Sequence, residues 1–304
     1  MKTPSKHVVP RQSQDPASHY RPKSTTSVDA IETPVAGLLR GLPGVVDVNV
    51  SPAKRKLDHR IIHLKDWHFL PRNLFVADLR ERSDQEFSEE EIDELYQQHL
   101  LEVELVQAEQ MTLLRCLLKH HGLRTVYAEG LTDEDALLFR IKIRLMKKTE
   151  RRLQEPRRIL REMREQLDQL AATTSNDSPE FQELFATRRK LESLLQLHQM
   201  DLLRIGAPGR LLMRGELETI LPADDLKAWE QSNPLDDDGK LNLDRALNEQ
   251  RENATVKKLL AAKPCAVVLF GGLHNFSNNV EQLSNGTCEY IRVTTRRYRQ
   301  FADR

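Results

Sequence analysis

The chain has 304 residues, and its 46 Lys and Arg residues balance 46 Asp and Glu residues, so the formal net charge is zero. This balance argues against a globally basic nucleic-acid-binding protein, and we expect no nucleic-acid partner. No stretch approaches the roughly 20 consecutive apolar residues of a membrane-spanning helix, so we expect no transmembrane segment.

Three cysteines, Cys116, Cys265 and Cys288, are widely spaced along the chain in apolar segments. Their odd number argues against a disulfide framework and predicts reduced, buried thiols. The basic N-terminus lacks the apolar core of a secretory signal peptide. Together these two features predict a cytoplasmic location.

The N-terminal residues 1–43 are rich in Pro, Ser, Thr and basic residues and show no hydrophobic period, which predicts a disordered arm. Ordered structure is predicted from residue 44 onward. Alternating apolar residues predict short strands over 45–50 and 60–64.

A long amphipathic helix is predicted after Ser88 and Glu91, which form a capping-box pair, and Gly122 suits the C-terminal end of this helix. The sequence RTVYAEG over 124–130 predicts a buried strand. A predominantly helical pattern then extends over about 135–205, with a kink expected at Pro156.

A break over 171–178 divides that helical region, which therefore predicts a hairpin of two long antiparallel helices. A homodimer through this hairpin is one expected assembly. The remaining predicted elements are a helix over 241–262, a strand over 265–270, a short helix over 274–283, a strand over 288–293 and a frayed basic tail over 296–304.

Strand–helix–strand patterns at both ends of the chain and a helical middle predict an α/β fold. We expect one α/β domain over 44–300. Its central sheet should be mixed or mainly parallel and flanked by helices, with the long helical hairpin inserted at about 135–205.

Three polar clusters follow predicted strands, at the point where each strand ends. They are Asp66 with His68, Glu129, and the sequence Gly271-Gly272-Leu273-His274. Ligands of open α/β sheets bind at the carboxyl ends of the strands, so these side chains would meet if the strands are neighbours. Two imidazoles and a carboxylate suit either a metal site or general acid–base chemistry.

The same residues carry a resemblance to the superfamily of erythromycin esterase, TraB, ChaN and Tiki proteins. Lys65-Asp66-Trp67-His68 is similar to the Gly-Glu-x-His motif of that superfamily, and Glu129 matches its strand-terminal Glu. Gly271-Gly272-Leu273-His274 matches its Gly-x-x-His motif, and Arg251-Glu252 is similar to its Arg-acid pair. The resemblance spans residues 58–295, but Lys65 replaces a Gly and Asp66 replaces a Glu.

The resemblance implies three kinds of activity. Esterase-like members hydrolyse esters, Tiki-like members resemble metal-dependent proteases, and ChaN-like members bind haem. We therefore expect a hydrolase of ester or amide bonds with a small-molecule or peptide substrate. The alternatives are a non-catalytic binder of haem or another metal chelate, and an interaction protein whose helical hairpin is the working surface.

Each candidate site residue has an expected role in the hydrolase. His68 is the expected general base, oriented by Asp66, and Glu129 is expected to activate water. His274 is the expected acid, and Arg251 would stabilise developing negative charge. His68, Glu129 and His274 are also the candidate metal ligands, and the two histidines are the candidate haem ligands.

Overall fold

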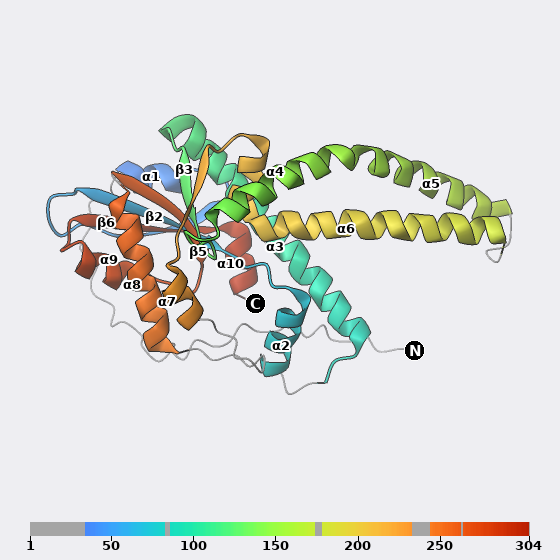
Figure 1. Cartoon of the computed structure of the whole chain (residues 1–304). Coiled ribbons are helices and arrows are strands. Elements are labelled where there is room, and N and C mark those ends of the chain that lie inside the picture. The colour runs from blue at the N-terminus through green and yellow to red at the C-terminus, as the bar shows by residue number, and fades with distance from the viewer. Residues whose placement is uncertain (1–33, 83–85, 174–177, 233–243, 263, 304) are drawn as a thin grey trace. The chain divides into compact units, whose positions relative to one another are not determined.

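The computed structural model describes residues 34–82, 86–173, 178–232, 244–262 and 264–303 of the chain (Figure 1). Most of the predicted disordered arm, residues 1–33, therefore lies outside the described residues. The chain divides into two compact units. Unit 1 contains the residues up to Glu134 together with Thr219–Arg304, and unit 2 is Asp135–Glu218.

Unit 1 is an α/β unit. Its strands are β1 (Val45–Ser51), β2 (His59–Asp66), β3 (Thr125–Ala128), β4 (Thr219–Pro222), β5 (Cys265–Gly271) and β6 (Cys288–Thr295). Its helices are α1 (Pro34–Arg40), α2 (Arg72–Arg82), α3 (Glu89–His121), α7 (Leu226–Gln231), α8 (Arg245–Ala261), α9 (Ser277–Leu283) and α10 (Arg296–Ala302).

The six strands form one sheet in the order β1-β6-β2-β5-β3-β4. Strand β1 is antiparallel to β6, whereas all the other neighbouring pairs are parallel. The predicted α/β class with a mainly parallel sheet and flanking helices is therefore confirmed. Because β2, β5, β3 and β4 are mutually parallel, their carboxyl ends lie along one edge of the sheet.

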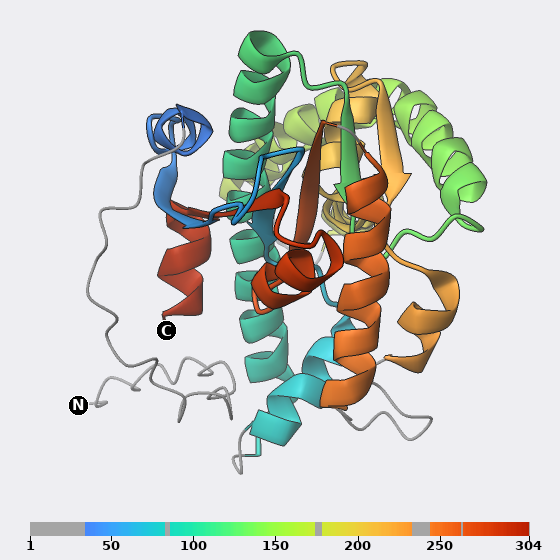
Figure 2. The same cartoon turned by 90° about the vertical axis from the view of Figure 1, so that its left-hand side faces the viewer.

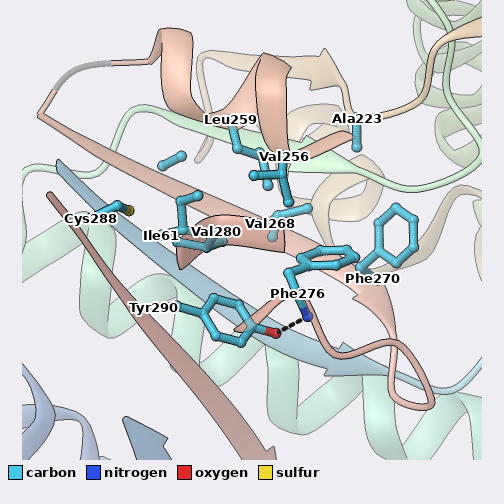
Figure 3. Close-up of a cluster of buried hydrophobic side chains, with 11 residues drawn as sticks. Ile61, Ala223, Val256, Leu259, Val268, Phe270, Phe276, Val280, Cys288 and Tyr290 are labelled. Carbon is cyan, nitrogen blue, oxygen red and sulfur yellow. Dashed lines mark hydrogen bonds between the residues drawn. The ribbon is translucent and has the colours of Figure 1, made fainter. Parts of the chain in front are cut away.

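Alternate residues of β2 point to opposite faces of the sheet, and a different helix covers each face. Figure 2 shows α3 and α8 on either side of the sheet. Ile61 packs in a core with Val256 and Leu259 of α8 and with residues of β5, β6 and α9 (Figure 3). Asp66, which points to the other face, accepts a hydrogen bond from Gln110 of α3. The sheet is thus buried on both sides, as is typical of a parallel sheet.

Two helices lie where the sequence predicted irregular structure. Residues 34–40 were expected in the disordered arm, but they form α1, in which Ala36 and Leu39 are fully buried. The C-terminal residues were expected to fray, but they form α10, in which Tyr298 and Phe301 are buried. Both helices have only seven residues, so tertiary packing rather than periodicity stabilises them.

Unit 2 contains three helices, α4 (Ala136–Arg152), α5 (Gln154–Thr173) and α6 (Pro179–Arg214), rather than the predicted pair. The first helix breaks at Leu153, because Pro156 lacks an N–H group and its ring excludes the carbonyl four residues earlier. Helix α6 kinks at Gly206, where φ is 68°, and continues to Arg214. The inserted unit therefore ends near residue 218 rather than 205.

The outer face of α4 carries exposed apolar side chains, at Leu137, Leu138, Ile141 and Leu145. Such a face is compatible with the homodimer expected through these helices, which stays a prediction. None of the described helices is both long and apolar enough to cross a membrane.

All three cysteines are free, but only Cys288 is buried as predicted. Burial raises the pKa of the Cys288 thiol to about 12. Cys116 is partly buried. Cys265 is exposed because it is the first residue of β5, and only the following residues of this strand are buried.

Candidate active site

The predicted site residues lie together at the carboxyl edge of the parallel strands in unit 1. Asp66 ends β2 and His68 follows it, while Glu129 follows β3 directly. His274 lies in the turn after β5. Arg251 reaches the same edge from α8. Residues that are far apart in the sequence meet here because parallel strands present their carboxyl ends on one side.

His68 lies between two carboxylates. Its Nε2 is 3.2 Å from Oε2 of Glu129, and its Nδ1 is 3.5 Å from Oδ2 of Asp66. Helix α3 holds the chain around His68 from both sides. Gln110 donates to Asp66 at 2.8 Å, and His99 accepts the Leu70 N–H at 3.3 Å.

Glu129 is held by a buried network that reaches across unit 1. Arg251 donates from Nη2 to Oε1 of Glu129 at 2.8 Å, and from Nε to Oδ1 of Asp224 at 2.7 Å. Asp224 is fully buried, and it also accepts the N–H of Gly130 at 2.7 Å. Arg251 therefore fixes the position of Glu129 and neutralises part of the charge of two carboxylates.

His274 has a different setting from the predicted one. The sequence placed it at the N-terminus of a short helix, but α9 begins at Ser277 and His274 lies in the preceding turn. Its Nδ1 is 2.8 Å from Oε1 of Glu252, and its Nε2 is 3.9 Å from Oε1 of Glu129. The Glu252 carboxylate, rather than a helix dipole, orients this imidazole.

Position 271 needs a glycine because neighbouring side chains come close to its Cα atom, and not because of its backbone conformation. A Cβ atom at this position would lie 2.5 Å from Nε2 of His68, 3.2 Å from Cδ2 of His274 and 3.3 Å from Oε2 of Glu129. The Gly271 N–H donates to Oε2 of Glu129 at 2.5 Å. The absence of a side chain thus allows three functional groups to meet at one backbone position.

The opposite charges of His68 and Glu129 shift each other's pKa. Burial by itself would raise the pKa of Glu129, but His68, Arg251 and His274 together outweigh it and lower this pKa to about 2. Burial by itself would lower the pKa of His68, but Glu129 and Asp66 outweigh it and raise this pKa to about 9. The Glu129 side chain is 11 % exposed and that of His68 46 %, so solvent screens His68 more strongly.

We expect the His68–Glu129 pair to stabilise the fold only within a pH window. The lowered pKa of Glu129 adds stability above about pH 4.5 that is lost as pH falls towards 2. The raised pKa of His68 adds stability below about pH 6.5 that is lost as pH rises through 9. The Tm of wild type should therefore exceed that of a His68→Gln variant most clearly between about pH 4.5 and about pH 6.5.

Thermal melts across this pH range, in buffer with a chelator, measure the Tm difference. A His121→Gln variant is the matched control, because His121 is an exposed imidazole at the end of α3. The control should show the wild-type profile. A Tm difference between wild type and His68→Gln that does not change with pH contradicts the prediction.

The arrangement does not favour a metal ion. Among the residues that the structure describes, no group of three or more His, Cys, Asp and Glu side chains is placed to hold one. Both oxygens of Glu129 already accept hydrogen bonds, and one of the donors is the Arg251 guanidinium, whose charge repels a cation. The metal and haem expectations thus stay predictions.

Sequence reasoning missed three residues of this network. Asp224 follows the short strand β4, which the sequence analysis did not identify, although an acid after a strand is the same signal that marked Glu129. Gln110 is one of three buried polar residues on the mainly apolar face of α3, with His99 and Gln107. Glu252 was noted only as part of a motif, and nothing in the sequence pairs it with His274.

No family model, no curated protein and no solved structure matches the chain. The superfamily resemblance therefore stays a prediction that rests on the short motifs quoted above.

Proposed function

We propose that the protein hydrolyses ester or amide bonds and that His68 and His274 are its general acid and general base. The observation that carries this proposal is that Nε2 of both imidazoles faces the same carboxylate, that of Glu129, while a separate carboxylate lies at each Nδ1. Two imidazoles that face one carboxylate and are each oriented by a second carboxylate are a workable pair for acid–base catalysis.

The two histidines differ in their electrostatic surroundings, and this difference assigns their roles. The raised pKa of His68 keeps it protonated at neutral pH, which suits a general acid rather than the predicted base. His274 donates its Nδ1 proton to Glu252 when the ring is neutral, which leaves the Nε2 lone pair as the acceptor. His274 is therefore the base in our proposal.

The reaction then proceeds in two steps. A water oxygen bonds to the acyl carbon while one water proton moves to Nε2 of His274. The bond to the leaving oxygen or nitrogen breaks with its electron pair on that atom, which takes the proton from His68. His274 returns a proton to solvent and His68 regains one, so one water is consumed to give an acid and an alcohol or amine.

Arg251 and Glu129 act as positioning residues in this scheme. Arg251 is 9 % exposed, and its Nε and Nη2 donate to Glu129 and Asp224. These bonds favour a positioning role over the predicted contact with developing charge on the substrate. Glu129 holds the His68 imidazole and stabilises its charged form. The lowered pKa of Glu129 makes it a weak base.

A panel of p-nitrophenyl esters and anilides tests the proposal. We expect measurable turnover by wild type and a fall in kcat/KM of about 100-fold or more in His68→Gln and in His274→Gln. His121→Gln is the control and should retain wild-type kcat/KM. Metal analysis of the purified protein, with turnover measured with and without a chelator, separates this mechanism from a metal-dependent one. Absence of turnover, or full activity in both site variants, contradicts the proposal.

A further inference from the structure

A second polar cluster adjoins the candidate active site, and we call it the Tyr298 cluster. It consists of Lys65, Trp67, Arg292 and Tyr298. The Lys65 Nζ lies 5.4 Å from the centre of the Tyr298 ring, and the Trp67 ring meets the Tyr298 ring edge-on with centroids 5.8 Å apart. Arg292 donates to the carbonyl of Gly272, a residue whose Cα borders the Tyr298 hydroxyl.

This cluster contains donors without acceptors. Within the part of the chain that the structure describes, the indole N–H of Trp67 and the Nε of Arg292 are buried and have no hydrogen-bond partner. Lys65 is partly buried and forms no hydrogen bond or salt bridge with the described residues. Asp47, an acid whose charge acts on Lys65, is paired with Arg299 at 3.1 Å.

The missing acceptors have an energetic consequence. A buried donor without a partner costs free energy, and most such groups in native proteins are paired. Burial, together with the repulsive effect of the Arg292 charge, lowers the pKa of Lys65 to about 8. An oxyanion between these groups would accept the free hydrogen bonds and remove the repulsion at the same time.

The cluster and the candidate active site share their backbone. Lys65 directly precedes Asp66, and Gly272 directly follows Gly271, which contacts His68 and Glu129. A ligand bound to Lys65 and Arg292 would thus lie close to the two imidazoles. The buried tyrosine also explains Gly272, since a Cβ there would lie 1.9 Å from the Tyr298 hydroxyl.

We propose that the Tyr298 cluster binds an oxyanion, a carboxylate or phosphate group carried by the substrate, through Lys65 and Arg292. This inference rests on the proposed hydrolase and deepens it by naming the substrate class, an ester or amide with a negative charge near the scissile bond.

Direct binding tests the inference without any turnover. Isothermal titration of the full chain with inorganic phosphate and with succinate should show binding of at least one of them. The Lys65→Met variant removes the charge and keeps the apolar stem, and it should weaken binding about ten-fold or more. The matched control is Lys54→Met, an exposed lysine paired with Glu281 in another part of unit 1.

Kinetics provide the second readout. The ratio of kcat/KM for mono-p-nitrophenyl succinate to that for p-nitrophenyl acetate should fall about ten-fold in Lys65→Met and stay at the wild-type value in Lys54→Met. Equal anion binding by wild type and Lys65→Met, or an unchanged ratio, overturns the inference. Anion binding without hydrolysis of any substrate overturns the proposed function alone, whereas hydrolysis without anion binding overturns only this inference.

Discussion

Replacement of Arg251 by methionine is expected to destabilise unit 1 by about 3–5 kcal/mol, since removal of one partner from a buried ion pair leaves the other charge uncompensated. Here Asp224, at 0 % exposure, loses its ion-pair partner, and Glu129, at 11 % exposure, loses one of its partners and keeps His68. This loss is a large part of the total stability of an ordinary domain, about 5–15 kcal/mol. Chemical denaturation followed by circular dichroism measures it.

Two further variants keep this prediction decisive if Arg251→Met does not fold. Adding Asp224→Asn to Arg251→Met removes the most deeply buried charge and should restore part of the lost stability. Arg245→Met, an exposed arginine in the first turn of the same helix, should stay within about 0.5 kcal/mol of wild type. Equal stability of Arg251→Met and Arg245→Met would show that the network does not stabilise the fold.

Replacement of Gly271 by alanine is expected to disrupt the candidate active site while leaving the fold intact. The added methyl group would lie 2.5 Å from Nε2 of His68, so the imidazole must move away from Glu129. His68 can move at little cost, because its side chain is 46 % exposed and the clash involves its far end. A displacement of about 1 Å in a catalytic group costs about 100-fold in rate, which is the expected fall in kcat/KM.

The displacement of His68 also has a spectroscopic readout. Separation from Glu129 should return the raised pKa of His68 towards 6.5, which a histidine NMR titration in chelator-containing buffer measures. The matched control is Gly41→Ala, in which the new Cβ meets only an ordinary contact of 3.4 Å with the Leu38 carbonyl. An unchanged His68 pKa in Gly271→Ala would contradict the close approach on which the site depends.

The long helix and five of the six strands of unit 1 could be predicted from the sequence because their signals are local, whereas the four-residue strand β4 was missed. The capping box of Ser88 and Glu91 and the left-handed Gly122 mark both ends of α3 within a few residues. The apolar run of β5 and the two glycines after it identify a buried strand with a tight turn. Helices α1 and α10 were missed because seven residues give too little periodicity, and contacts with the rest of unit 1 bury them.

The sequence by itself determined which residue types stand after the strands, namely Asp66, His68, Glu129 and His274. Only the tertiary structure decided their partners, because Arg251 and Glu129 are 122 residues apart in the chain and Gly271 and Glu129 are 142 apart. No local pattern encodes such pairings. The charge that each imidazole carries depends on which carboxylates the fold brings beside it, so the acid–base roles could be argued only once those distances were known.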